Sequence, residues 1–307
     1  ASTVRSRGVY KFPVKDKKSA QYDDHQCSSY DVEACSWSNI PDEDFALADD
    51  HHWTIGQFVW TGFDYLGEPS PYDTDAWPNH SSMFGIIDLA SLPKDRYYLY
   101  RSIWNKEAET LHILPHWTWP GREGEVTPVF VYTNYPAAEL FINGKSYGKQ
   151  SKNNSSLKSR YRLMWMDAIY EPGEVKVVAY DKDGKAVAEK SVRTAGKPHH
   201  IELVSNRNEL TADGKDLAYV TVKVVDKDGN LCPADSRLIN FSVKGAGKYR
   251  AGANGDPTSL DLFHLPKMHA FNGMLTAIVQ TNETAGEIIL TAKAGGVKAG
   301  SIRLLTK

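Results

Sequence analysis

The sequence predicts a mainly β protein that has a mixed α/β segment at its front and two immunoglobulin-like β-sandwich domains behind it. Three observations predict this fold class. Residues 41–104 combine helix-like segments with a short apolar run, which is typical of α/β folds. From residue 111 onward apolar and polar residues alternate with the period of strands, and turn residues separate the segments. The length of 307 residues also favours two or three domains, since one domain has roughly 150.

Two helices and one strand are expected in the front, residues 1–108. Pro41–Ala48 has a proline near its start and acidic residues in its first turn, which favours a helix. The apolar run Gln57–Trp60 follows Gly56 and predicts a buried strand. A second helix is predicted over Pro93–Trp104, where three aromatic side chains at helical spacing indicate core packing: Tyr97, Tyr100 and Trp104.

Short strands are expected throughout the middle, residues 109–197. Val129–Thr133, Glu139–Ile142 and Glu174–Tyr180 have strand character. Asn143-Gly144 predicts a hairpin, with Lys145–Gly148 as the returning strand. About seven such strands predict an immunoglobulin-like sandwich. The Asp181–Gly184 segment resembles part of a calcium loop, but it lacks the later acidic ligands, so a turn is favoured.

The rear, residues 198–307, follows a linker at Thr194–Pro198 and repeats the pattern of strands separated by Asp-Lys-Asp-Gly turns. Strands are predicted at His200–Val204 and Ala218–Val225, and a second Asp-Lys-Asp-Gly turn follows at Asp226–Gly229. The closing strands are expected at 285–292 and 300–305. The rear is therefore expected to be a second sandwich of the same general class.

The composition disfavours several classes of partner. There are 36 basic and 38 acidic residues, so no strong field attracts nucleic acid or an anionic membrane. No apolar run reaches the roughly 18 residues of a membrane span. The three cysteines, Cys27, Cys35 and Cys232, are expected to be small buried residues, with a Cys27–Cys35 bridge as the alternative. No paired ligand spacing indicates a metal, so neither metal nor cofactor is expected.

Tryptophan is concentrated in the front half, since seven of the eight tryptophans precede residue 120. Just after the predicted strand, the segment Trp60–Pro69 combines an indole with carboxylates and a tyrosine hydroxyl. An indole face stacks on a pyranose ring, while carboxylates and hydroxyls bind its hydroxyl groups, so this segment is a candidate sugar site. The alternative is that Trp60 packs in the core.

The segment Gly56–Pro69 resembles the last barrel strand and following loop of glycoside hydrolase family 2, particularly the bacterial β-galactosidases. Asn254–Ser259 resembles part of the invasin-like immunoglobulin modules of such enzymes. The resemblance extends over essentially the whole chain through four further segments: Ser82–Asp88, Pro93–Tyr98, His116–Gly124 and Glu139–Lys145. It implies that residues 1–108 are the C-terminal end of a (β/α)₈ barrel, which needs about 250 residues when complete.

The resemblance also implies retaining hydrolysis by two glutamates about 5–5.5 Å apart. In close relatives the nucleophilic glutamate precedes Thr-Ala-Ser, and Ala1-Ser2 matches the end of that motif. The chain is therefore expected to be a C-terminal fragment that begins just after the nucleophile. It would contain no catalytic residue and would be inactive alone.

Four residues carry the substrate-binding expectation. Trp60 matches the sugar-contacting tryptophan of the family, and Asp64 and Glu68 match the loop beyond it without assigned roles. Ser2 stands where some β-galactosidases have a substrate-contacting histidine. Family-2 glucuronidases hold a uronic acid by an Asn-x-Lys motif. In this chain the segment Ser82–Phe84 stands in its place and has no lysine. A neutral galactoside is therefore the expected substrate.

Two other functions are compatible with the sequence. The sandwiches could form a carbohydrate- or surface-binding module without catalysis, which an exposed aromatic strip would favour. They could also serve as spacers or oligomer contacts, so a homo-oligomer is possible. From the family alone, the expected location is the bacterial periplasm or the cell exterior.

Overall fold

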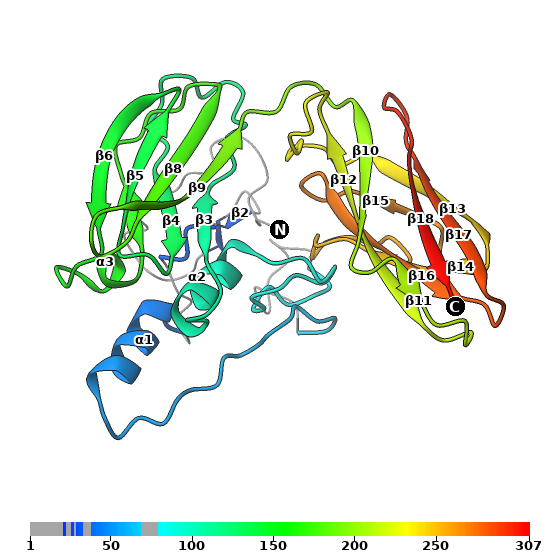
Figure 1. The fold of residues 1–307 in the computed structure, drawn as a ribbon, viewed down its shortest axis with the longest axis horizontal. Helices are drawn as coiled ribbons and strands as arrows, with labels where there is room; N and C mark the ends of the chain where they lie inside the picture. The colour runs from blue at the N-terminus through cyan, green and yellow to red at the C-terminus, as the bar shows by residue number, and fades with distance from the viewer. Residues whose placement is uncertain (1–20, 23–25, 28, 33–37, 69–78) are drawn as a thin grey trace.

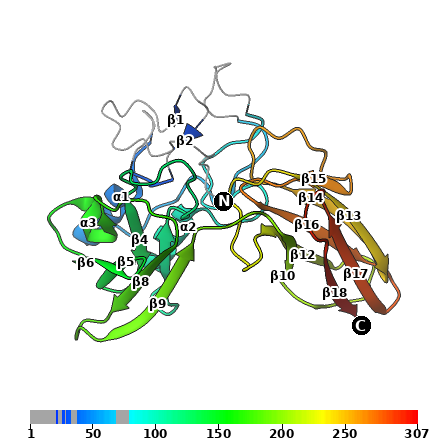
Figure 2. The same cartoon turned by 90° about the horizontal axis from the view of Figure 1, so that it is seen from above.

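The computed structural model describes residues 21–22, 26–27, 29–32, 38–68 and 79–307. Figure 1 shows a mainly β molecule in which two stacks of sheets stand apart from each other. Strands β3–β9 form the first sandwich and strands β10–β18 form the second. In Figure 1 the front segment, residues 38–68 and 79–104, runs below the first stack and between the two, and in Figure 2 part of it again lies between them. The mainly β prediction is confirmed.

Both helices predicted in the front segment are present. Helix α1 spans Pro41–Asp50 and helix α2 spans Asp95–Trp104. Phe45 of α1 is buried and makes edge-to-face ring contacts with Tyr100 and with Tyr161, which is worth about 1 kcal/mol per pair beyond the area buried. Before these helices, β1 (Gln21–Tyr22) and β2 (Gln26–Cys27) pair antiparallel.

The predicted buried strand at Gln57–Trp60 is wrong for the structure described. These residues are not in a strand, and Phe58 is fully exposed. A strand needs neighbouring backbone to accept and donate its hydrogen bonds. Within the described ranges no strand pairs with this run, so its apolar pattern finds no sheet to enter.

The first sandwich has seven strands in two sheets, and the short helix α3 (Leu157–Tyr161) lies between β6 and β7. One sheet has the order β3 (Leu111–Leu114), β4 (Val129–Thr133), β7 (Leu163–Trp165). The other has the order β6 (Lys145–Ser151), β5 (Ala137–Ile142), β8 (Glu174–Tyr180), β9 (Ala186–Arg193). Its core includes Trp117, Leu140, Trp165 and Val177, all fully buried.

The second sandwich has two larger sheets. One has the order β10 (His200–Ser205), β12 (Leu217–Val225), β16 (Met274–Thr281), β14 (Gly247–Ala253). The other has the order β11 (Glu209–Leu210), β18 (Gly300–Thr306), β17 (Gly286–Lys293), β13 (Leu238–Gly245), β15 (Lys267–His269). Its core is mostly aliphatic, with Val220, Ile239, Leu275 and Leu290 fully buried.

The predicted turns form as their residue types require. Asn143 and Gly144 both have positive φ, at 50° and 79°, and they connect β5 to β6. In each Asp-Lys-Asp-Gly turn the first aspartate accepts hydrogen bonds from main-chain amides two and four residues ahead, at 2.9–3.0 Å. These aspartates, Asp181 and Asp226, therefore close turns, as the sequence predicted.

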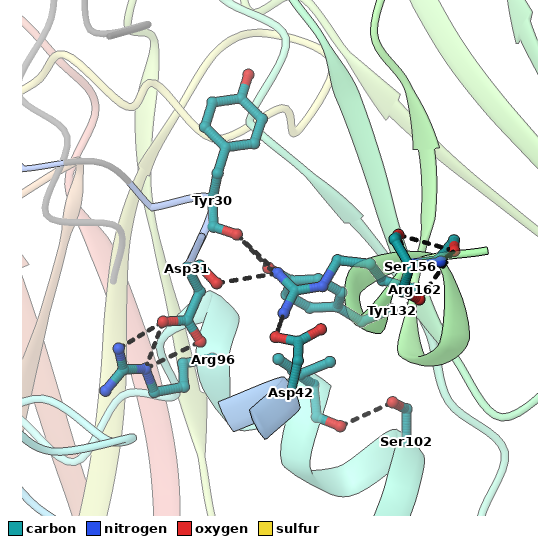
Figure 3. A network of polar contacts seen from close by, with 10 residues as sticks. Tyr30, Asp31, Asp42, Arg96, Ser102, Tyr132, Ser156 and Arg162 are labelled. Carbon is teal, nitrogen blue, oxygen red and sulfur yellow. Dashed lines mark hydrogen bonds and ion pairs between the residues drawn. The ribbon is translucent and has the colours of Figure 1, made fainter. Parts of the chain in front are cut away.

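A buried polar network joins the front segment to the first sandwich (Figure 3). The Arg162 side chain is fully buried and forms an ion pair with the equally buried Asp42 of α1. Arg162 also donates hydrogen bonds to the main-chain oxygens of Tyr30 and Asp31, at 3.0 and 3.1 Å. Nearby, Arg96 Nε lies 3.0 Å from both carboxylate oxygens of Asp31. These contacts join α1 and α2 to Arg162, the residue directly before β7.

Candidate functional site

The candidate sugar site follows the exposed run in the front segment. The indole of Trp60 is 74% exposed, and its Nε1 donates a hydrogen bond to the Tyr65 hydroxyl at 3.2 Å. That hydroxyl donates in turn to the Glu68 carboxylate, and this bond raises the pKa of Tyr65. The structure thus joins Trp60 and Glu68 through Tyr65. It leaves an aromatic face beside a polar edge, which suits a sugar ring.

Asp64 belongs to the same loop, and its side chain is buried. Its carboxylate is ion-paired with Lys94 Nζ, at 2.7 and 2.8 Å, and it accepts a hydrogen bond from the Gly85 amide at 2.8 Å. Lys94 also donates to the main-chain oxygen of Met83 at 3.2 Å. Burial raises the pKa of Asp64, and the lysine acts in the opposite direction. Asp64 therefore anchors the loop to the segment that precedes α2.

The backbone of this loop lies directly against the backbone of residues 81–87. Asp64 donates its amide proton to the Ile87 oxygen at 2.9 Å, and the Ser82 amide donates to the Tyr65 oxygen at the same distance. A side chain at Gly85 would stand 2.3 Å from the Asp64 nitrogen. Only glycine allows this approach, so the position of the loop depends on Gly85.

The second sandwich contacts the same segment. The His80 amide donates to the Pro257 oxygen at 2.7 Å, and Thr276 Oγ1 donates to the Ala90 oxygen at 2.7 Å. Gly255 lies so close to Asp88 that an added Cβ would stand 2.1 Å from Oδ2. A strand-to-strand loop of the second sandwich therefore borders the front segment on the side of His80.

The structure joins two of the four predicted site residues, Trp60 and Glu68, through Tyr65. Asp64 is buried and paired with Lys94 instead, and Ser2 lies outside the described residues. Whether these residues contact a substrate stays a prediction. Sequence reasoning assigned no role to Lys94, although the segment around it carried part of the resemblance. The available signal was Asp64 itself, which follows Phe63 directly, because a carboxylate that becomes buried needs a cation.

No metal site or membrane-spanning helix is found in the part of the chain that the structure describes. Among those residues, no three histidine, cysteine or acidic side chains come together as metal ligands. Each described helix is also too short or too polar to cross a bilayer. Cys232 is free and buried, whereas the side chains of Cys27 and Cys35 lie outside what the structure describes.

Comparison with known proteins connects the chain to one enzyme family. Residues 201–303 match glycoside hydrolase family 2 C-terminal domain 5, and residues 124–188 match a domain of unknown function. A β-galactosidase of Bacteroides ovatus is 42% identical over 99% of this chain and 35% of its own length. A β-glucuronidase of Formosa agariphila is 25% identical over 86% of this chain and 27% of its own length.

A solved structure agrees with these matches. The crystal structure of a β-glycosidase from Bacteroides vulgatus is 32% identical and superposes with a TM-score of 0.82, covering 91% of this chain and 34% of that one. The chain spans about a third of the length of the B. ovatus relative. Identity, coverage and fold agree, and the chain belongs to glycoside hydrolase family 2, with its last sandwich matching a C-terminal domain of that family.

Proposed function

We propose that this chain is the C-terminal portion of a retaining exo-glycosidase that removes β-linked galactose from neutral oligo- or polysaccharides. The observation that carries the proposal is the exposed Trp60 indole, whose Nε1 donates to the Tyr65 hydroxyl, which in turn donates to Glu68. In this arrangement the indole forms a wall of the sugar subsite. The relatives differ in substrate, since they include both β-galactosidases and β-glucuronidases.

The electrostatics of the loop favour a galactoside over a glucuronide. A uronic acid needs a cation to pair with its carboxylate. Where family-2 glucuronidases have the lysine of their Asn-x-Lys motif, this chain has the segment Ser82–Phe84, which contains no lysine. Lys94 lies beside the loop, but it is buried and already paired with Asp64 and with the Met83 oxygen. A uronate would therefore meet no available ammonium from this residue.

The front segment also supports a place at the end of a (β/α)₈ barrel. Trp53, Ile55 and Phe58 are largely or fully exposed, although such side chains normally lie in a core. A barrel built with further polypeptide would cover them and would supply both catalytic glutamates. In this proposal both sandwiches are immunoglobulin-like accessory domains of that longer enzyme.

We also propose a cellular location and an oligomeric state, and both rest on the family alone. The longer enzyme would be periplasmic or secreted, and it could be a homo-oligomer. Cell fractionation and the solution mass of the purified enzyme test these two points.

Hydrolysis of nitrophenyl glycosides tests the proposal. The purified 307-residue chain is expected to be inactive, while the longer polypeptide hydrolyses nitrophenyl β-galactoside with a higher kcat/KM than the β-glucuronide. In the longer polypeptide, Trp60→Ala should lower kcat/KM about tenfold or more, because a stacking wall of the transition state is lost. Trp60→Phe is the matched control and should retain part of the activity.

Three results would contradict the proposal. Turnover by the 307-residue chain alone would show that the chemistry does not need further polypeptide. A preference for the glucuronide would overturn the substrate assignment. Equal activities of the wild type and Trp60→Ala would remove Trp60 from the subsite.

A further inference from the structure

We propose that the second sandwich carries a binding subsite for the distal sugar units of a neutral oligosaccharide, on the loop of residues 254–264. The proposal rests on the proposed function only in taking that oligosaccharide as the substrate. Two pockets flank this loop, one with many polar groups and one mostly apolar, and both include Asp261. A chain of sugar rings can occupy such a pair of neighbouring pockets.

The first pocket has a volume of about 460 Å³ and many polar groups. Within it, Asp261 accepts a hydrogen bond from the His269 amide at 2.7 Å, and it lies 2.9 Å from His269 Nδ1. The ring of His269 is half exposed, so it remains open to a ligand. Asp235, Asp256 and Leu260 also line this pocket.

The second pocket, of about 510 Å³, lies on the other side of Asp261 and has Leu262 and Phe263 in its wall. Leu262 is 56% exposed, and Leu260, on the wall of the first pocket, is 76% exposed. Because these leucines are exposed, they do not pack in the core of the sandwich. They offer apolar surface to the C–H face of a sugar ring.

The loop also lies close to the candidate sugar site. Pro257 accepts the His80 amide proton at 2.7 Å, and the His80 oxygen accepts the Gly67 amide proton at 3.1 Å. Gly67 is next to Glu68, so two backbone hydrogen bonds connect the pocket loop to the loop of Trp60. The two loops are therefore neighbours, and in this proposal a glycan whose terminal sugar lies at Trp60 extends along this connection toward the second sandwich.

The charges of the first pocket indicate the class of ligand. Asp235, Asp256 and Asp261 line it. Asp235 is ion-paired with Arg237, whereas the Asp261–His269 pair is partly exposed and offers a carboxylate and an imidazole to sugar hydroxyls. Among the described residues that line this pocket there is no lysine or arginine to pair with a uronic acid or a sulfated sugar. A neutral glycan therefore fits the pocket better than an acidic one.

Titration of the 307-residue chain with a neutral β-galactotetraose tests this proposal, with binding measured by calorimetry and saturation-transfer NMR. We expect saturable binding that is at least about tenfold weaker in Asp261→Asn and in Leu260→Ser. Leu305→Ser is the matched control. Leu305 is 44% exposed on β18, which two strands separate from β15 and its His269, so binding should be unchanged.

The outcomes separate this subsite from the proposed catalysis. In the longer enzyme, Leu260→Ser should raise KM for the tetraose severalfold and leave turnover of nitrophenyl β-galactoside unchanged. Failure of the longer enzyme to hydrolyse galactosides would refute the proposed function, while binding by the 307-residue chain would still support the subsite. Absence of saturable binding, or equal loss in Leu260→Ser and Leu305→Ser, would overturn the subsite.

Discussion

Removing Arg162 should destabilise the protein more than any exposed substitution. In Arg162→Met, the Asp42 carboxylate stays fully buried and loses its cationic partner, and the main-chain oxygens of Tyr30 and Asp31 each lose the hydrogen bond that Arg162 donates. Removing one partner of a buried ion pair costs about 3–5 kcal/mol. Since a domain is stable by roughly 5–15 kcal/mol, much of the stability of this interface depends on one side chain.

The assay is urea unfolding followed by tryptophan fluorescence, with the free energy of unfolding extrapolated to water. The double variant Asp42→Leu/Arg162→Met removes both charges, and it should be about 2 kcal/mol more stable than Arg162→Met alone. It will not recover fully, because the main-chain oxygens of Tyr30 and Asp31 still lack the hydrogen bonds that Arg162 donates, although Tyr30 keeps the one from the Tyr132 hydroxyl.

The pH dependence of Arg162→Met gives an independent check. Burial raises the pKa of Asp42, and loss of the guanidinium raises it further. A carboxyl whose pKa is raised in the folded state favours folding when protonated, so its stabilising effect is lost as pH rises through that pKa. Arg162→Met should therefore be less destabilised at pH 5 than at pH 8. A cost under about 1 kcal/mol, or a double variant no more stable than the single one, would refute the reasoning.

Two further predictions concern backbone contacts. Gly85→Ala puts a Cβ 2.3 Å from the Asp64 nitrogen and should cost about 1–3 kcal/mol in urea unfolding; a cost near zero would show that the loop can move away. Burial raises the pKa of Asp226, but its hydrogen bonds with Gly196, Asn230 and Asp228 outweigh this and lower it to about 2. Its stabilisation should therefore be lost as pH falls from about 4 to 2, and Asp226→Asn should flatten the circular-dichroism acid titration in that window. An unchanged acid titration would contradict this.

The strands and turns of both sandwiches could be predicted because their signals are local. Strand β8 has the predicted bounds, Glu174–Tyr180, since strict alternation meets a turn-forming Asp181 at its end. Asn143-Gly144 fixed the hairpin between β5 and β6 because few other residue pairs accept positive φ at both positions. Helix α1 begins at Pro41 as predicted, for the same kind of local reason.

The errors and omissions concern residues whose environment comes from distant segments. Gln57–Trp60 has the composition of a buried strand, but a strand also needs neighbours that no local pattern specifies. The partner of Asp64 is thirty residues away at Lys94. The contact of His80 with Pro257 joins residues 177 positions apart, and nothing in either segment indicates the other.

The contact between Pro257 and His80 closes a ring of three interfaces. The front segment is joined to the first sandwich at Arg162, and the linker is held by Thr118 on one side and by Asp226 on the other. The second sandwich returns to the front segment at Pro257. If any one of these junctions opens, the other two still keep its halves at a high effective concentration, so it reforms as an intramolecular event. The arch in Figure 1 is therefore expected to loosen as a unit rather than by the swing of one domain.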